Sequence, residues 1–236
     1  MKTQKLHILA MGPHPDDVEL GCGGTLAKAV SQGKNVGIID LTRGELGTRG
    51  TVEKRLQESE NAAKILGITA RENLGMRDGF FQNNEENQLK IIDAIRRYQP
   101  EILICGAPDD RHPDHGRATQ LIRESAFLAG LKSIITEHEA WRPKRIFMYI
   151  QWKPLQPDFV VDISGFLEIK IQSCLAHVSQ FYDPNSSEPE TAISSKSFKD
   201  SITYRAREWG RLIWKDEAEA FITDSILGVD NMDVFL

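Results

Sequence analysis

Residues 6–17 read Leu6-His7-Ile8-Leu9-Ala10-Met11-Gly12-Pro13-His14-Pro15-Asp16-Asp17. The first half of this stretch is an apolar run of strand length. Apolar residues then recur at helical spacing, at Val18, Leu20, Leu26, Ala29 and Val30. His14, Asp16 and Asp17 are therefore predicted to lie in a loop between a strand and a helix. Two prolines stiffen this loop and a carboxylate can cap the helix, so the motif alone also permits a purely structural turn.

A second loop of the same build follows another apolar run. It reads Ile102-Leu103-Ile104-Cys105-Gly106-Ala107-Pro108-Asp109-Asp110-Arg111-His112-Pro113-Asp114-His115-Gly116. Alone, this stretch could be a histidine-rich surface turn that Asp114 caps. Because two such loops end two predicted strands, a shared site explains them better than coincidence does.

Strands and helices alternate along the chain through residue 130. The predicted strands are 6–11, 35–41, 71–74 and 101–105, and the predicted helices are 18–32, 53–66, 85–98 and 115–129. This alternation is typical of a parallel sheet with right-handed crossovers. With the common strand order 3-2-1-4, strands one and four are neighbours at the switch point, where ligands bind beyond the carboxyl ends. We therefore predict a doubly wound, mostly parallel α/β sheet whose site lies between strands one and four.

The remainder of the chain has a less regular pattern. It predicts strands at 145–150 and 159–163, a helix at 165–177, a polar loop at 179–196, a further helix through Tyr204 and Trp209, and an acidic tail. No linker divides the chain, so residues 1–236 are expected to form one domain. Residues from about 180 to 236 are expected to be partly variable and to supply a lid and oligomer contacts. The apolar residues of this tail are expected to pack on the body or on a partner chain; they are Ile226, Leu227, Val234, Phe235 and Leu236.

Composition excludes several classes of protein. The 236 residues are 40% hydrophobic with a net charge of −5, and the pI is near 5.7, which argues against binding to a nucleic-acid backbone. No apolar run reaches the ~18 residues that a membrane span needs. Cys22, Cys105 and Cys174 are widely spaced and are expected to be reduced thiols. A cytoplasmic protein without a nucleic-acid or membrane partner is therefore expected.

The two loops together offer the donors of a catalytic metal site. Such zinc sites use three ligands drawn from histidines and a carboxylate and leave one position for water, whereas structural sites are mostly closed by cysteines. His14, Asp17 and His115 fit that set, with one Zn²⁺ per chain. Zinc lowers the pKa of a bound water molecule to ~7 and polarises the carbonyl group under attack. Fe²⁺ or Co²⁺ could occupy the same ligands.

The remaining loop residues fit the roles of proton carrier and oxyanion partner. Asp16 is expected to take the proton of the attacking water. His112, held charged and oriented by Asp114, is expected to stabilise the tetrahedral oxyanion and to protonate the leaving amine. Whether one residue or two carry the protons stays open. The other histidines are interpreted as ordinary ones, namely His7, His138 and His177.

These motifs resemble those of a known family. His14-Pro15-Asp16-Asp17, His112-Pro113-Asp114-His115 and Thr42-Arg43-Gly44-Glu45 look like the signatures of the LmbE-like (PIG-L) zinc-dependent N-deacetylases. The resemblance covers the chain through about residue 180. It implies a Rossmann-like fold and the same metal ligands, with Asp16 as general base and His112 with Asp114 serving the tetrahedral intermediate.

Within that family the chain looks most like the bacillithiol-pathway enzymes that deacetylate N-acetylglucosaminyl-malate. The resemblance places the substrate-contacting arginine at Arg55, with Arg111 as a weaker candidate, and implies a homo-oligomer, such as a hexamer. Arg43 and Arg49 are further partners for the malyl carboxylates. A tyrosine near the site in some relatives has no matching position. Another N-acetyl sugar or a small amide is the alternative substrate.

A nucleotide-binding Rossmann protein is the rival hypothesis. Gly21-Cys22-Gly23-Gly24 is glycine-rich, and Asp40 ends the second strand where a ribose-binding acid would lie. However, these glycines fall inside the first predicted helix and lack the G-x-G-x-x-G spacing. Small residues there are better explained by close packing of the helix on the sheet.

Overall fold

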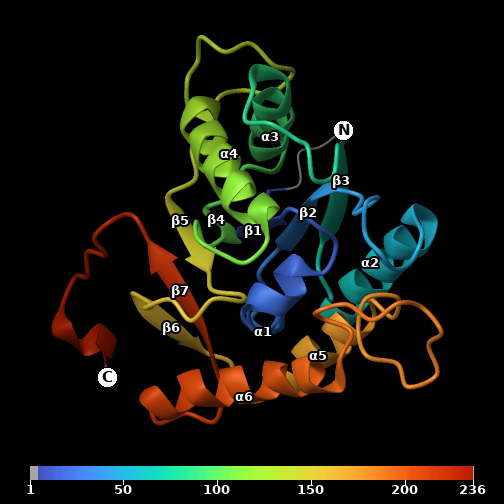
Figure 1. Cartoon of the computed structure of the whole chain (residues 1–236). Coiled ribbons are helices and arrows are strands. Elements are labelled where there is room, and N and C mark those ends of the chain that lie inside the picture. The colour runs from blue at the N-terminus through green and yellow to red at the C-terminus, as the bar shows by residue number, and fades with distance from the viewer. Residues whose placement is uncertain (1–4, 236) are drawn as a thin grey trace.

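The computed structural model describes residues 5–235, and Leu236 of the predicted apolar tail lies outside them. One sheet runs through the molecule in the order β3-β2-β1-β4-β5-β7-β6 (Figure 1). Its strands are β1 (Ile8–Gly12), β2 (Val36–Thr42), β3 (Ala70–Met76), β4 (Ile102–Gly106), β5 (Arg145–Tyr149), β6 (Phe159–Asp162) and β7 (Ala218–Thr223). The first five are parallel, whereas β7 pairs antiparallel with β5 and with β6. The predicted mostly parallel sheet and the 3-2-1-4 order are confirmed.

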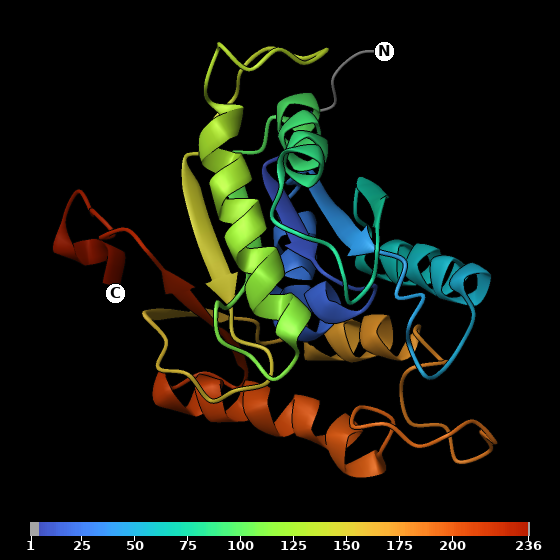
Figure 2. The same cartoon turned by 45° about the horizontal axis from the view of Figure 1, so that its top comes forward.

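Helices cover both faces of this sheet. They are α1 (Asp17–Ser31), α2 (Val52–Leu66), α3 (Glu85–Tyr98), α4 (Pro113–Ala129), α5 (Leu167–Leu175) and α6 (Lys196–Leu212), with a 3₁₀ turn at Met232–Phe235. α3 and α4 lie on one face, and α1 and α2 lie on the other, where α5 packs against both (Figure 1). Figure 2 shows α6 crossing the molecule on the side towards which β5 points. The carboxyl ends of the parallel strands therefore face the C-terminal part of the chain.

Strand residues alternate between two cores because successive side chains point to opposite faces. Leu9 and Met11 of β1 pack in the core beneath α3 and α4, whereas Ile8 and Ala10 pack in the core beneath α1. β1 and β2 are buried along their whole length, which accounts for their apolar runs. All three cysteines are buried and free, as expected.

Close packing accounts for the glycines of α1. A Cβ atom at Gly21 would lie 2.2 Å from the Tyr149 ring, and one at Gly24 would lie 2.6 Å from Ile163. Neither contact is sterically tolerable, so both positions need glycine. α1 also bends at Cys22, whose φ of −146° is not helical. Glu219 accepts hydrogen bonds from the backbone N–H groups of Gly24 and Thr25 just after this bend.

The predicted acidic tail is wrong in its first part, because residues 218–223 form the strand β7 inside the sheet. Its acidic residue Glu219 is buried and forms an ion pair with Lys170 of α5. An unpaired carboxylate would not be stable in this position, so the strand depends on a partner distant in sequence.

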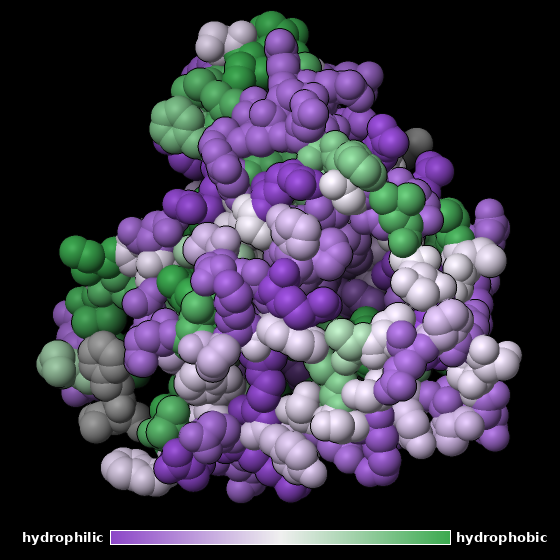
Figure 3. All heavy atoms as spheres, viewed as in Figure 1, coloured by the Kyte–Doolittle hydropathy of each residue, from purple (hydrophilic) through white to green (hydrophobic). Residues whose placement is uncertain are grey.

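Residues 224–234, after β7, are exposed. Hydrophobic side chains gather at the left edge of the face in Figure 3, over the C-terminal segment, where Ile226 and Val234 are 96% and 65% exposed. Packing of this tail on the body is therefore not what the structure shows for these two residues. Among the described residues, none of the helices has the length and apolar character needed to cross a membrane.

Candidate active site

The two histidine and aspartate loops meet at the carboxyl ends of β1 and β4. β1 and β4 are direct neighbours in register from Ile8 with Ile102. The ring centroid of His14 lies 4.8 Å from that of His112 and 5.9 Å from that of His115. The sheet order therefore brings together side chains about a hundred residues apart in sequence.

The first loop has an unusual backbone conformation at Asp16. Its φ is 118°, which is rare for a residue with a side chain, and such strain is found where surrounding structure enforces it. The Asp16 side chain makes no capping hydrogen bond to α1 although it precedes the helix. A simple capping role for Asp16 is thereby excluded, and its carboxylate faces the cavity that the loops enclose.

Asp17 lies between the two predicted metal-binding histidines. Its Oδ2 atom is 3.0 Å from His14 Nδ1, and its Oδ1 atom is 3.2 Å from His115 Nε2. The predicted ligand set of His14, Asp17 and His115 is thus brought together. Two histidines and one carboxylate match the donors of catalytic zinc sites, so these residues fit a divalent cation.

Further donors surround His14. Its Nε2 atom lies 3.1 Å from Asp78 Oδ1 and 3.3 Å from Asp114 Oδ2. Two groups have donor atoms within 4.8 Å of one another, namely His14 with His112 and His115, and His14 with Asp78 and Asp114. The structure therefore offers alternative ligand sets that share His14.

The neighbouring carboxylates set the protonation of His14 and His115. Burial alone lowers the pKa of His14, but hydrogen bonds to Asp114, Asp17 and Asp78 raise it well above its usual value. The pKa of His115 is raised to about 9, since Asp17 and Asp110 outweigh desolvation. A cation that binds here would displace these protons, and the same negative charge would attract it.

Burial gives Asp16 a pKa suited to a general base. Desolvation raises its pKa to about 6, although the Arg55 guanidinium opposes this shift. Arg55 Nη2 is 3.5 Å from Asp16 Oδ2. A base with a pKa near the working pH can both accept and return a proton.

Arg55 is buried and uses its donors on backbone atoms. It donates to the carbonyl oxygen atoms of Gly44 and Pro15 over 3.0 and 2.9 Å. A Cβ atom at Gly44 would lie 1.9 Å from Arg55 Nη1, so this contact requires glycine. These bonds favour a role in tying two loops together beside Asp16. The predicted contact of Arg55 with substrate stays a prediction, although the residue does line the cavity.

His112 was expected to contact the carboxylate of Asp114, and this prediction is wrong, because it contacts the backbone of Asp114. His112 Nδ1 accepts a hydrogen bond from the backbone N–H of Asp114 at the start of α4. The Asp114 carboxylate instead contacts His14, the N–H of Gly79 and the Arg117 guanidinium. Desolvation, with the charges of His14 and His115, lowers the pKa of His112. The lowered pKa and the bond accepted at Nδ1 favour a neutral ring with its proton on Nε2, where a charged ring was expected.

Three residues of the site were missed by sequence reasoning. Asp78 reaches His14 from the loop after β3, Asp110 lies 3.1 Å from His115 Nδ1, and Gln151 donates to Asp17 Oδ1. Asp110 belongs to the second histidine and aspartate loop, but its position in the sequence did not distinguish it from the neighbouring Asp109. The signal for Gln151 was its position directly after the strand beside β4.

A cavity of about 330 Å³ opens above these side chains, a volume typical of small-molecule sites. Leu46, Trp152 and Ile193 give it apolar walls, and Gln180 adds an amide. The exposed Arg111 places its guanidinium 4.5 Å from the centre of the Trp152 ring. Arg111 is therefore available to a ligand at this cavity.

The other predicted cationic partners are placed differently. Arg49 is buried and pairs with Glu188 and Ser186, so its charge is already matched. Arg43 is exposed. Within the described part of the chain, no side-chain hydrogen bond or ion pair joins either arginine to the two histidine and aspartate loops.

The interpretation of His177 as an ordinary histidine is wrong. It is fully buried, and its Nε2 atom lies 3.0 Å from Glu19 Oε1. Glu19 also pairs with Arg71, which binds both carboxylate oxygen atoms of Asp40. This buried network lies behind Asp16, whose pKa the charge of His177 lowers.

Comparison with known proteins identifies the family. The family model of PIG-L, described as GlcNAc-PI de-N-acetylase, matches residues 9–127. The diacetylchitobiose deacetylase of Thermococcus kodakarensis is 32% identical, over 74% of this chain and 70% of that protein. A probable N-acetyl-alpha-D-glucosaminyl L-malate deacetylase 2 of Bacillus subtilis is 27% identical, over 75% of this chain and 84% of that protein.

A solved structure shares both fold and sequence. The conserved protein TT1542 from Thermus thermophilus superimposes with a TM-score of 0.86 at 39% identity, covering 95% of this chain and 98% of that one. The matched family region contains both histidine and aspartate loops, which confirms the resemblance stated from the motifs. This protein therefore belongs to the PIG-L family of de-N-acetylases.

Proposed function

We propose that this protein is a metal-dependent N-deacetylase that releases acetate from an N-acetylglucosamine-containing substrate. One observation carries the proposal. A buried carboxylate, Asp16, whose pKa is raised to about 6, stands beside a donor set of two histidines and one carboxylate in a substrate-sized cavity. Hydrolysis of an amide needs a base and a polarised carbonyl group, and this arrangement supplies places for both.

His14, Asp17 and His115 would hold the cation. A divalent metal bound there would lower the pKa of a water molecule and polarise the acetyl carbonyl group. Zn²⁺ suits these donors, and Fe²⁺ or Co²⁺ would accept the same ligands. Asp110 and Gln151 orient the ligands, since they contact the free nitrogen of His115 and the second oxygen of Asp17.

Asp16 carries the proton in both directions. It accepts the proton of the attacking water while the new C–O bond forms, and it returns a proton to the amine as the C–N bond breaks. The guanidinium of Arg55 stabilises the ionised form of Asp16 before the first transfer and after the second, so that the buried carboxylate is not trapped in its protonated state.

His112 acts as a neutral hydrogen-bond donor. Because its Nδ1 atom accepts the backbone N–H of Asp114, its Nε2–H is free to point at the oxygen atom of the tetrahedral carbon. Developing negative charge on that oxygen strengthens the bond, which lowers the barrier. This assignment leaves the proton transfers to Asp16 alone.

The cavity suits a sugar with an acetamido group. Trp152 provides an apolar surface, and Arg111 at the same wall suits a ligand carboxylate. N-acetylglucosaminyl-malate is the narrower proposal, supported by Arg111 and by the 27% identity to a probable deacetylase of that substrate. Diacetylchitobiose is the second candidate, supported by the 32% identity to its deacetylase.

The rival nucleotide-binding hypothesis needs a free carboxylate at Asp40 to bind a ribose. Asp40 is buried, and both of its carboxylate oxygen atoms accept hydrogen bonds from Arg71. It therefore has no free position for a ribose hydroxyl group. The glycines of the rival motif lie within α1, where they pack against Tyr149 and Ile163.

Acetate release from a panel of sugars tests the proposal. The panel contains N-acetylglucosamine, diacetylchitobiose and N-acetylglucosaminyl-malate, each with protein stripped of metal and with protein reloaded with Zn²⁺, Fe²⁺ or Co²⁺. We expect release only after reloading. Release that persists without metal, or no release from any member with any metal, would overturn the proposal.

A further inference from the structure

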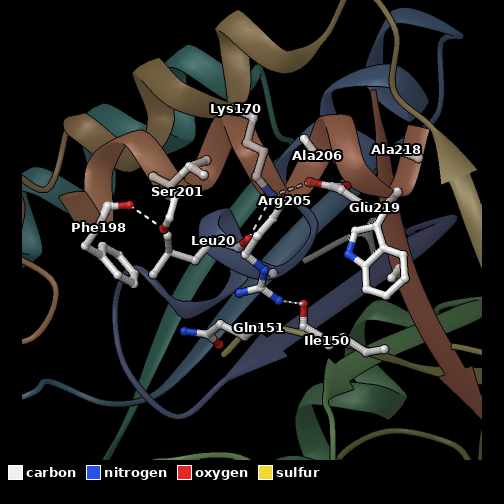
Figure 4. A pocket seen from close by; sticks show the side chains of 14 residues that line it. Leu20, Ile150, Gln151, Lys170, Phe198, Ser201, Arg205, Ala206, Ala218 and Glu219 are labelled. Carbon is white, nitrogen blue, oxygen red and sulfur yellow. Dashed lines mark hydrogen bonds and ion pairs between the residues drawn. The ribbon is translucent and has the colours of Figure 1, made fainter. Parts of the chain in front are cut away.

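A second, smaller cavity adjoins the candidate active site. It has a volume of about 40 Å³ and lies between α1, α6 and the ends of β5 and β7 (Figure 4). Leu20 and Gln151 line both cavities. Gln151 donates to Asp17 Oδ1 over 2.7 Å on the active-site side. The two cavities are therefore separated by little more than these side chains.

Arg205 of α6 supplies the uncompensated charge of this cavity. Figure 4 shows its guanidinium between Leu20 and the Ile150–Gln151 backbone. Its one hydrogen bond within the described chain goes from Nη2 to the carbonyl oxygen of Ile150, over 3.2 Å. No ion pair with a carboxylate of residues 5–234 accompanies it. Desolvation lowers the pKa of Arg205, and only the more distant Asp110 opposes this shift.

The other charges of the cavity neutralise each other. Lys170 forms an ion pair with Glu219 and donates to the carbonyl oxygen of Leu20. Glu219 also accepts the backbone N–H groups of Gly24 and Thr25, so neither of its oxygen atoms is free. The cavity consequently keeps one net positive charge, that of Arg205. A partly buried guanidinium without a counter-ion is costly and is stabilised by a bound anion.

The size and walls of the cavity restrict that anion. About 40 Å³ holds roughly three water molecules. Ile202, Ala206 and Ala220 also line it and give it apolar walls that suit a methyl group. We propose that this cavity binds a small monocarboxylate, and that in the deacetylase it receives the acetate released from the substrate.

This assignment rests on the proposed function. Hydrolysis places the water oxygen on the acetyl carbon, breaks the C–N bond and leaves acetate and an amine. The amine stays on the sugar in the large cavity, whereas acetate forms next to Asp17, which Gln151 contacts. Movement past Gln151 and Leu20 brings the carboxylate to Arg205. Acetate can then leave the large cavity before the larger product departs.

Acetate binding to the metal-loaded protein tests the inference directly. Titrations followed by NMR of the acetate methyl group compare wild type with Arg205→Met, Arg205→Lys and Arg211→Met. Arg211 is the matched control because it lies on the same helix, exposed and paired with Glu208. We expect Arg205→Met to weaken acetate binding about tenfold or more, as the loss of charge-assisted hydrogen bonds does, and Arg205→Lys to restore part of it. Acetate should also become a weaker product inhibitor in Arg205→Met.

The outcomes separate this inference from the proposed function. Equal acetate affinity in wild type and in a folded Arg205→Met variant would overturn the inference. Succinate is the comparison ligand. If succinate binds wild type as tightly as acetate does, and Arg205→Met loses succinate binding, the cavity is a substrate subsite and the acetate assignment is overturned. If no N-acetyl sugar is hydrolysed but Arg205→Met loses acetate, the anion site stands and the deacetylase proposal fails.

Discussion

The side-chain amide of Gln151 donates a hydrogen bond to Asp17 Oδ1 over 2.7 Å, from the end of β5 to the start of α1. Asp17 contacts both His14 and His115, so this bond orients the carboxylate that links the two histidines. Partners of metal ligands typically contribute about 10–100-fold in affinity. We predict that Gln151→Leu weakens Zn²⁺ binding by about this factor, measured by competition with a chelator.

A matched control is Gln172→Leu on α5. Gln172 is exposed, and among the described residues its side chain forms a hydrogen bond only with Glu168. Zinc affinity should not change in this variant. Unchanged affinity in Gln151→Leu would show that the hydrogen bond does not orient Asp17.

Loss of a metal ligand should empty the site. His115→Ala removes a nitrogen donor whose Nε2 atom is 3.2 Å from Asp17. We predict that elemental analysis finds about one metal ion per chain in wild type and only a small fraction of that in His115→Ala. His138→Ala, whose ring contacts Asp93 far from the site, is expected to keep its metal. Full occupancy in His115→Ala would contradict the ligand assignment.

Asp16→Asn should separate catalysis from metal binding. The amide resembles the carboxylate in shape but cannot accept the proton of water, and general-base catalysis is worth about 10²–10⁴-fold. We expect kcat to fall by this factor while the metal content stays at the wild-type level. A kcat near that of wild type would exclude Asp16 as the base.

The sequence predicted the parts of the site that local pattern determines. His14, Asp16, Asp17, His112 and His115 follow apolar strands directly, and the parallel order brings those strand ends together. A single sequence therefore revealed both the sheet and the meeting of its two loops. The side-chain contacts within each loop could be determined only from the structure. An example is the hydrogen bond that His112 Nδ1 accepts from the backbone N–H of Asp114.

The residues that sequence missed depend on long-range contacts. Asp78 follows β3, which is two strands away from β1, and only the course of its loop brings it to His14. Residues of β7 were predicted to belong to an acidic tail, because the partner that allows Glu219 to be buried, Lys170, lies 49 positions earlier. No local periodicity records such pairings, so polar residues buried by distant partners are the hardest to predict.

The buried Glu19 should make stability depend on pH in the acid range. Although desolvation raises the pKa of Glu19, Arg71 and His177 lower it to about 2, from an ordinary value of 4.5. A lowered carboxyl pKa stabilises the fold fully above the unfolded value and less as pH falls through the folded value. We predict that Glu19→Gln reduces the free energy of unfolding by about 3–5 kcal/mol at pH 7.

The difference between wild type and Glu19→Gln should shrink as pH falls from 4.5 towards 2, in urea titrations at each pH. Glu208→Gln is the control, because Glu208 forms an exposed pair with Arg211 on α6. A difference that stays constant across this range would indicate that the ionisation of Glu19 does not contribute to stability.

Arg55 and Arg111 should affect different steps, because their environments differ. Arg111 is exposed over Trp152, so a substrate carboxylate can reach it. We predict that Arg111→Ala raises the KM for N-acetylglucosaminyl-malate about tenfold, the lower end for a charge-assisted pair, and leaves the KM for diacetylchitobiose nearly unchanged.

Arg55 is buried against two backbone carbonyl groups beside Asp16, so Arg55→Ala should lower kcat on both substrates. Lysine at position 55 should restore only part of this loss, because it lacks the planar fork. If Arg55→Ala instead impairs only the malate-bearing substrate, Arg55 contacts the malyl group as the family resemblance implies, and its role beside Asp16 is secondary.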